Sequence, residues 1–247
     1  MLERIRHSVS TIGHFSYSKN SLGASMNLGV LQALVYKKLG DTTGSFWIPS
    51  EIVAYINEGI QDIAFRTKSI KTDSTFSAFA GIPNYNLQAS FPLCLAITEV
   101  YYYNIQTLKW VKLHSTTRTE LDETQPGWLS VPTSLPTRYW YDRELNEFYL
   151  YPNPDASYVS PNQVWGYYSI QSTDLSSSTD IPQIPQPIHL AIIDYATAVG
   201  SETRGWMDKA QVNWTSYYKR LADYDIERGR ETEDENTYMK SYRRVNI

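Results

Sequence analysis

The sequence predicts an α+β protein in which a four-helix bundle-like scaffold is interrupted by an inserted antiparallel β-sandwich or barrel. Three observations lead to this prediction. Apolar residues recur at helical spacing in residues 26–70 and again in residues 180–228. Residues 71–179 instead contain short segments rich in Tyr, Trp, Val and Ile, separated by Gly, Pro, Asn and Asp. Each helix pair is too small to fold well alone, so we expect the pairs to pack together.

Two helices are expected before the insert. Residues 27–39 carry an apolar face, with Asn27 suited to cap the first turn and Gly40 suited to end the helix. The second helix begins at Pro49, because proline fits the first turn of a helix, and its pattern fades near Thr67. Its apolar face consists of Ile52, Ile56, Ile60 and Ile63.

Seven short strands are expected in the insert. They are residues 75–79, 85–89, 95–103, 109–114, 138–142, 147–151 and 163–169. The clearest unit is a hairpin, in which a polar turn at residues 142–146 separates two aromatic strands. Pro152 and Pro154 end the second of these strands, because proline cannot donate a hydrogen bond to a sheet. Seven strands at this spacing are typical of a sandwich or a barrel.

Two further helices are expected after the insert. Residues 188–199 contain Asp194 as their one charged side chain, which predicts a mostly buried helix. Residues 208–228 present apolar residues at alternating spacings of four and three, a regular seam for packing on another helix. The seam consists of Ala210, Trp214, Tyr217, Leu221 and Tyr224.

Both ends of the chain differ from this scaffold. Residues 1–25 are polar and rich in Ser, which predicts an extended arm. Residues 229–247 contain an acidic block followed by basic residues and few apolar side chains. Such a composition predicts a tail that is disordered until it meets a partner.

Composition excludes several classes of protein. The net charge of −4 argues against avid nucleic-acid binding, which needs concentrated basic charge. The single Cys94 allows no disulfide and no thiol-based metal site, and we expect it to be buried. No apolar run is long enough to span a membrane, and no apolar core follows Arg4 and Arg6 as in a signal peptide. We therefore expect a soluble protein of the cytoplasm, with no membrane partner.

Motifs that carry chemistry are also missing. The sequence contains no glycine-rich phosphate loop, no dinucleotide-binding turn and no nucleophile elbow. The four histidines are scattered and show no metal-ligand spacing: His7, His14, His114 and His189. We expect a structural or surface role for His189. Two acidic pairs are candidates for glycoside hydrolysis, Asp122 with Glu123 and Glu144 with Glu147. Both fit solvated turn positions better, so we expect no enzyme and no catalytic, metal or cofactor-binding residues.

Several stretches resemble a known family. The chain resembles the head-to-tail adaptor (connector) proteins of tailed bacteriophages, including the tail tubular protein A type of podoviruses. The stretches that carry this resemblance occur in the expected order within residues 26–228. They are Leu39-Gly40-Asp41, Phe46-Trp47, the helix from Glu51 to Gly59, the run from Glu147 to Pro154, and Ile181-Pro182-Gln183-Ile184-Pro185.

The resemblance implies a structural subunit of the virion, assembled in the host cytoplasm. Such proteins form a ring at the head–tail junction, commonly dodecameric, between the portal protein and tail or nozzle proteins. The ring encloses the channel for genome DNA, with which contact would be transient and non-specific. The C-terminal segment often reaches the portal, which implies portal-binding residues in this tail. The candidates are Glu231, Glu233, Asp234, Glu235, Tyr238, Tyr242, Arg243, Arg244 and Ile247.

The aromatic content leaves alternatives open. The chain has 20 Tyr, 7 Trp and 7 Phe, and such side chains suit protein interfaces as well as sugar-binding surfaces. We expect most rings in the insert to be core or subunit contacts, including those at residues 101–103 and Trp140. The alternatives are a carbohydrate-binding tail or baseplate module that uses the aromatic insert, and a glycoside hydrolase that uses Glu144 or Glu147.

Overall fold

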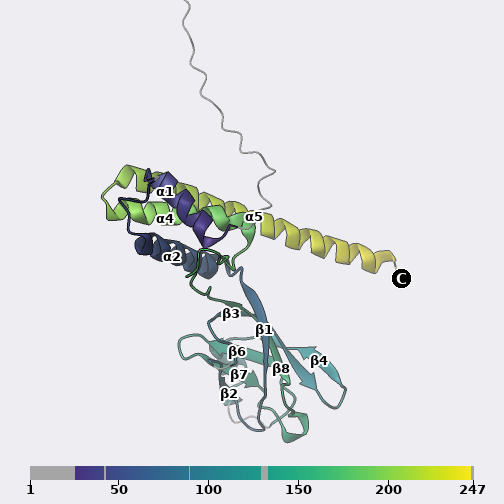
Figure 1. The fold of residues 1–247 in the computed structure, drawn as a ribbon. Helices are drawn as coiled ribbons and strands as arrows, with labels where there is room; N and C mark the ends of the chain where they lie inside the picture. The colour runs from purple at the N-terminus through teal and green to yellow at the C-terminus, as the bar shows by residue number, and fades with distance from the viewer. Residues whose placement is uncertain (1–25, 42, 89, 129–132, 246–247) are drawn as a thin grey trace, which may run out of the picture.

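The computed structural model places the helices α1, α2, α4 and α5 in one part of the molecule and the strands in another (Figure 1). It describes residues 26–245 except 42, 89 and 129–132, and side chains only as far as residue 229. This part of the chain is α+β, with five α-helices and two four-stranded sheets. The expected arm at residues 1–25 lies outside the described residues.

The first two helices have the predicted bounds. Helix α1 spans Leu28–Leu39, and the Asn27 side chain accepts a hydrogen bond from the backbone N–H of Val30 at 3.0 Å. Gly40 ends α1 in the left-handed conformation, with φ of 86°, which glycine adopts without steric cost. Helix α2 spans Pro49–Thr67 and buries the four predicted isoleucines.

The last two helices are longer than expected. Helix α4 spans His189–Thr203, and α5 spans Met207–Val245. The expectation of a helix that stops at residue 228 before a disordered tail is therefore wrong, because α5 continues through Gly229. A single glycine costs a helix only about 1 kcal/mol relative to alanine, and the Glu, Lys and Arg residues that follow favour a helix.

Helices α1, α2, α4 and α5 share one hydrophobic core. Helix α4 contacts each of the other three, which explains why it carries almost no charge. The core includes the isoleucines of α2 and the predicted seam of α5, where Tyr217 is fully buried. The segment that precedes α4 contains the 3-10 helix η4 (Gln186–Ile188). It also contributes to this core, through Leu175, Ile184 and Ile188.

The strands form two sheets. The first is antiparallel throughout and has the order β1-β8-β3-β4. The second has the order β2-β7-β6-β5, and its β6–β7 hairpin has the predicted bounds. The bounds are β1 Lys71–Phe76, β2 Asn84–Asn86, β3 Cys94–Asn104, β4 Lys109–Lys112, β5 His114–Ser115, β6 Arg138–Asp142, β7 Glu147–Tyr151 and β8 Val164–Ile170. The expected antiparallel pattern fails at β5, which pairs parallel with β6.

Both sheets contribute to a second hydrophobic core. Val100 and Tyr102 come from the first sheet, and Phe148 and Leu150 come from the second. Two short helices lie between strands: α3 (Arg118–Thr124) and the 3-10 helix η3 (Ala156–Tyr158). Helix α3 was not expected from the sequence, and a small third cluster forms beside it from Leu121, Trp128, Trp140 and Tyr151.

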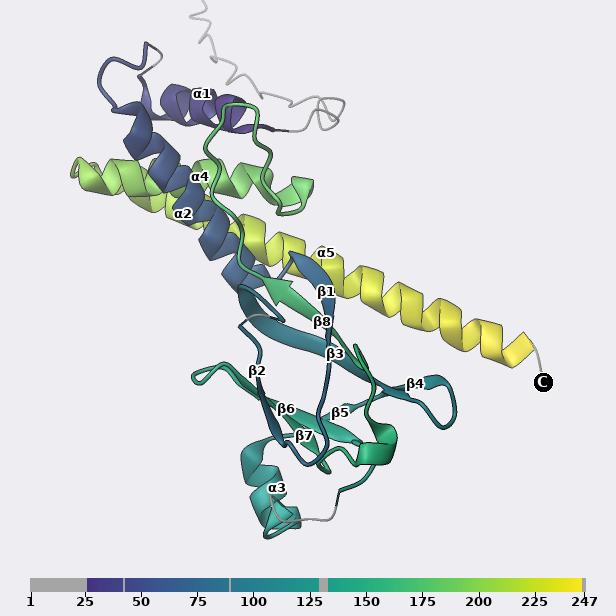
Figure 2. The ribbon, with the colours of Figure 1, turned by 60° about the horizontal axis from the view of Figure 1, so that its bottom comes forward.

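The two parts are joined where α2 runs into β1 and where β8 leaves the sheet (Figure 2). The backbone N–H of Ile170 donates to the carbonyl oxygen of Ile70 at 3.0 Å, which ties the two crossing segments together. Gln171 donates through its side-chain amide to the Oε1 of Gln61 on α2 at 3.1 Å. The β part is thus anchored to the carboxyl-terminal half of α2.

Candidate interaction surface at the end of the helices

The candidate catalytic acids have ordinary structural partners. Asp122 and Glu123 lie on α3, so their expected position in a turn is wrong; Asp122 accepts from Trp128 Nε1 at 2.8 Å. Glu144 lies in the β6–β7 turn, and Glu147 on β7 accepts a hydrogen bond from the Tyr149 hydroxyl. In the described part of the chain no group of three or more His, Cys, Asp or Glu side chains could hold a metal ion.

The other reactive side chains are also accounted for. His189 is buried and donates from Nε2 to the carbonyl oxygen of Ile184 at 2.9 Å, and burial lowers its pKa below the usual range. Burial raises the pKa of the Cys94 thiol to about 11, which keeps the sulfur protonated and unreactive at neutral pH. His114 is exposed on β5, whereas His7 and His14 lie outside the described residues.

The candidate portal-binding residues lie on or beyond the distal half of α5. Its helical backbone extends to Val245, so the candidates from Glu231 to Arg244 occupy a helix. Their side chains, and Ile247 altogether, lie outside the described part of the structure. No helix within the described ranges combines the length and apolar character needed to cross a bilayer.

The loop between α1 and α2 is organised by one carboxylate. Asp41, which is buried, accepts at Oδ2 from the backbone N–H groups of Phe46 at 2.9 Å and Trp47 at 3.1 Å. Its Oδ1 accepts from the backbone N–H of Ser45 and the hydroxyl of Thr43, each at 3.2 Å. Desolvation acts to raise the pKa of Asp41, but these hydrogen bonds outweigh it and lower the pKa below its usual range.

The Asp41 loop carries two neighbouring aromatic side chains that touch edge-on, with ring centroids 5.6 Å apart, and differ in exposure. Trp47 is 2% exposed and belongs to the helical core, whereas Phe46 is 54% exposed. Trp206, from the turn between α4 and α5, stacks on Phe46 with ring centroids 6.2 Å apart and meets Trp47 edge-on at 6.1 Å. The guanidinium of Arg204 lies 4.8 Å from the Phe46 ring centroid and 4.7 Å from that of Trp47.

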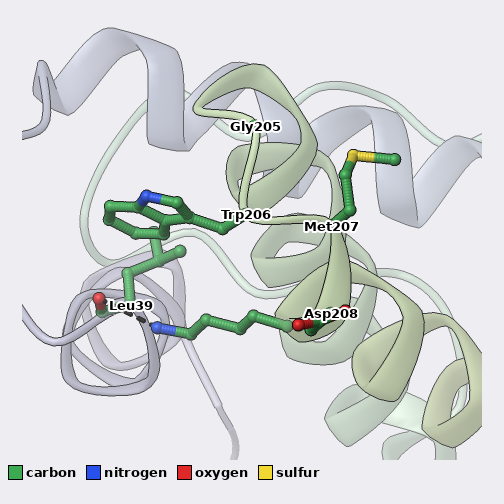
Figure 3. Close-up of a pocket in the computed structure, with 6 residues that line it drawn as sticks. Leu39, Gly205, Trp206, Met207 and Asp208 are labelled. Atoms are coloured by element: carbon green, nitrogen blue, oxygen red, sulfur yellow. Dashed lines mark hydrogen bonds between the residues drawn. The ribbon is translucent and has the colours of Figure 1, made fainter.

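An open pocket of about 530 Å³ adjoins the Trp206 ring (Figure 3). Its lining comes from the end of α1 and from the start of α5: Leu39, Gly205, Trp206, Met207, Asp208 and Lys209. Lys209 Nζ donates to the carbonyl oxygen of Leu39 at 3.0 Å, which holds α5 against the last turn of α1. Burial, with a smaller contribution from Lys38, lowers the pKa of Lys209.

The amino-acid sequence that forms both the helices and the sheets matches a known protein family. The sequence model of the SU10 adaptor protein family matches residues 26–245. The chain belongs to the SU10 adaptor protein family. No curated protein shows significant similarity to it. The family consists of structural adaptor proteins of phages, so the chain is a phage structural protein and a virion component. The resemblance expected from the sequence is thereby confirmed at the level of a phage adaptor.

In this SU10 adaptor, two of the stretches that carried the resemblance build one surface. Gly40 and Asp41 shape the loop, and Phe46 and Trp47 form its aromatic pair. Trp206 and Met207 lie beside this loop, and Met207 is 62% exposed. Together these residues form an apolar surface at one end of the helices. We call the surface formed by Phe46, Trp206 and Met207 the helix-end surface. Large apolar side chains around an open pocket suit a protein partner rather than a reaction.

Sequence reasoning missed part of the helix-end surface of this SU10 adaptor. Trp206 and Met207 lie outside the seam that packs α5 on the core, and their spacing carries no signal of its own. Gly205 adopts a φ of 73° in the turn that precedes them. A glycine beside two large apolar residues, between two helices, was the available signal for an apolar turn exposed at the end of a bundle.

Proposed function

We propose that this chain is a subunit of the phage head–tail connector, forming a ring between the portal and tail or nozzle proteins. The family match over residues 26–245 is the observation that carries this proposal, because it spans both hydrophobic cores and the whole of α5. We take the ring to be dodecameric, as in the tail tubular protein A type that the sequence resembles. The channel within it would pass genome DNA.

The two separate hydrophobic cores support two domains with different roles within such a subunit. We infer a discontinuous helical domain from residues 26–70 and 180–228, and an inserted β domain from residues 71–179. The helical domain would build the ring wall and the β domain would contact neighbouring proteins. The net charge of −4 suits a conduit, because strong phosphate binding would slow the passage of DNA.

The geometry of α5 supports portal docking by residues 229–247. The helix has 39 residues, which corresponds to a length of about 58 Å at 1.5 Å per residue. Its buried residues include Ala210, Tyr217 and Leu221, all in the first half. The second half extends beyond the other helices in both views (Figures 1 and 2). A projecting helix with acidic and then basic residues can reach a partner that the core of the subunit does not touch.

Portal docking can be tested with purified portal rings. The full chain and a chain ending at residue 228 are mixed with the rings, and co-sedimentation measures binding. We expect the full chain to bind and the shortened chain to lose at least about 90% of its binding. The thermal unfolding of both should be the same, because residues 229–247 follow the last core residue of α5, Leu221. Equal binding by the two chains would refute the docking claim.

A further inference from the structure

The junction between the helical part and the β part is narrow. The chain crosses it from α2 into β1 and again from β8 back to the helices, and the hydrogen bond between Ile170 and Ile70 joins the two crossings. Ile170 packs against both hydrophobic cores. Contacts of α1, α2, α4 and α5 with the strands are otherwise sparse. Two adjacent crossings keep the parts together but restrain rotation about the junction only weakly.

Two side-chain contacts beside the junction tie the β part to α2. The guanidinium of Arg143, in the β6–β7 turn, lies 5.2 Å from the ring centroid of Phe65. The side-chain amide of Gln171 reaches Gln61, as described above. Phe65 is 50% exposed, and cation–π contacts that are open to solvent are weak. These contacts alone hold the β part loosely.

Helix α5 reaches the same junction through Arg228 (Figure 2). Arg228 donates from Nη1 to the carbonyl oxygen of Thr67, the last residue of α2, at 2.6 Å. Carbonyl groups in the last turn of a helix lack partners within the helix and form the negative end of its dipole, so a guanidinium binds there favourably. Lys68 follows with a left-handed φ of 48°, as the chain leaves α2 toward β1. Arg228 therefore holds the turn of backbone from which the β part departs.

The position of the Arg228 guanidinium is set by α5 itself. The guanidinium lies 6.0 Å from the ring centroid of Tyr224, and its Nη2 lies 3.7 Å from Oδ1 of Asp225. Both residues precede Arg228 by about one turn of the same helix. Earlier on α5, the Tyr217 hydroxyl donates to the carboxylate of Asp62 on α2. A change in the direction of α5 near Arg228 is thus passed to the end of α2.

We propose that Arg228 is a positioning residue that couples the direction of α5 to the orientation of the β part. Arg228 directly precedes residues 229–247, and the use of this coupling rests on the proposed docking of those residues on the portal. A subunit whose distal α5 is seated on the portal would then present its β part to neighbouring proteins at one fixed angle.

The test measures the distance between the two parts in the free chain. Spin labels are introduced as unnatural amino acids at position 108, in the β3–β4 turn, and at position 212, on α5. The native Leu108 and Val212 are 72% and 65% exposed. The unmodified chain should give a single narrow distance distribution. Arg228→Gln should widen it at least about twofold, because the amide is uncharged and too short to reach the carbonyl oxygen of Thr67.

The matched control is Lys219→Gln, which removes another exposed cation from α5 and should leave the width unchanged. Equal widths in Arg228→Gln and the unmodified chain would overturn the proposal. If Arg228 only capped α2, its replacement would lower the melting temperature without widening the distribution, which would equally overturn it. So would a broad distribution in the unmodified chain.

Portal rings separate a failure of the coupling from a failure of docking. The unmodified chain and Arg228→Gln both keep residues 229–247 and should both co-sediment with the rings, but only the unmodified chain should give the narrow distribution there. A narrow distribution for bound Arg228→Gln would overturn the coupling, because contacts in the ring alone would then set the angle. If neither chain bound the rings, the docking claim would fail, and the free chain would still decide the role of Arg228.

Discussion

Arg220 on α5 donates from Nε to Oδ2 of Asp194 on α4 at 2.6 Å. The same carboxylate accepts from Lys38 of α1 at its other oxygen, so one side chain with 4% exposure joins three helices. Both cations are about two-fifths exposed, and their charged ends reach Asp194 from the surface. Asp194, the one charged residue within residues 188–199, therefore ties the helical core together.

Asp194→Ala should lower the free energy of unfolding by about 2–3 kcal/mol, because it removes two charge-assisted hydrogen bonds from a buried carboxylate. Urea unfolding at pH 7 measures the loss. The control is Arg118→Ala, which breaks an exposed pair with Asp122 and should cost less than about 1 kcal/mol. Equal losses in the two variants would show that Asp194 does not hold the helices together.

Asp41→Asn should destabilise the loop that carries Phe46 and Trp47. An amide keeps one accepting oxygen but cannot accept at its nitrogen, so part of the set of backbone hydrogen bonds is lost. The lowered pKa of Asp41 means that its contribution is present above its unfolded pKa and is lost as pH falls through the folded pKa.

The melting temperature of Asp41→Asn should therefore lie below that of the unmodified chain at pH 7, and the gap should shrink in acid. Glu123→Gln, on the exposed side of α3, serves as the control and should melt as the unmodified chain does at pH 7. A gap that stays constant down to strongly acidic pH would contradict the role of the Asp41 charge.

His189 should make the helical core sensitive to mild acid. Its pKa is lowered by burial, so the unfolded chain binds a proton more readily than the folded chain between the folded pKa and about 6.5. Stability therefore falls as pH drops through this window. Protonation would also place an N–H at Nδ1, which has no partner among the described residues.

The comparison uses urea midpoints at pH 7.5 and pH 5.5 for the unmodified chain and for His189→Gln. The unmodified chain should lose more stability on acidification than the variant, although the variant is less stable at pH 7.5. The same pH dependence in both would show that His189 is not the cause of the effect.

Gly166→Ala should destabilise the β part. A Cβ at this position of β8 would lie 2.5 Å from Cζ of Phe91, whose ring is 1% exposed and stacks on Tyr168. Overpacking of this kind costs typically 1–3 kcal/mol. Gly229→Ala meets no atom within 4 Å and should stabilise α5, so it is the control. Thermal unfolding of both variants checks the prediction, which fails if Gly166→Ala melts as the unmodified chain does.

The sequence predicted the elements whose pattern is local. The α2 bounds followed from Pro49 and four isoleucines, and the β6–β7 hairpin followed from aromatic strands around a polar turn. Helix α3 was missed because only Leu121 is buried in its seven residues, so it has no apolar period. The parallel pairing of β5 with β6 depends on where His114 lies in space, which no local pattern encodes.

The candidate surfaces were predicted less well, for a related reason. The sequence showed that Phe46 and Trp47 are adjacent, but only the packing of the helices shows that Trp47 joins the core and Phe46 stays exposed. The aromatic abundance was visible, but its gathering on one sheet face needs the register that sets Tyr101 opposite Trp165. The pairing of strands that are distant in sequence, more than composition, therefore determines which aromatic rings lie on the surface.

Cryo-electron microscopy of portal rings incubated with this chain tests whether it forms the connector ring. We predict a closed ring of this chain on one face of the portal, with the distal half of α5 against the portal protein. In intact particles the same ring should lie between portal and tail. Density of the chain elsewhere, such as in tail fibres, or portal rings with no added ring of density, would contradict it.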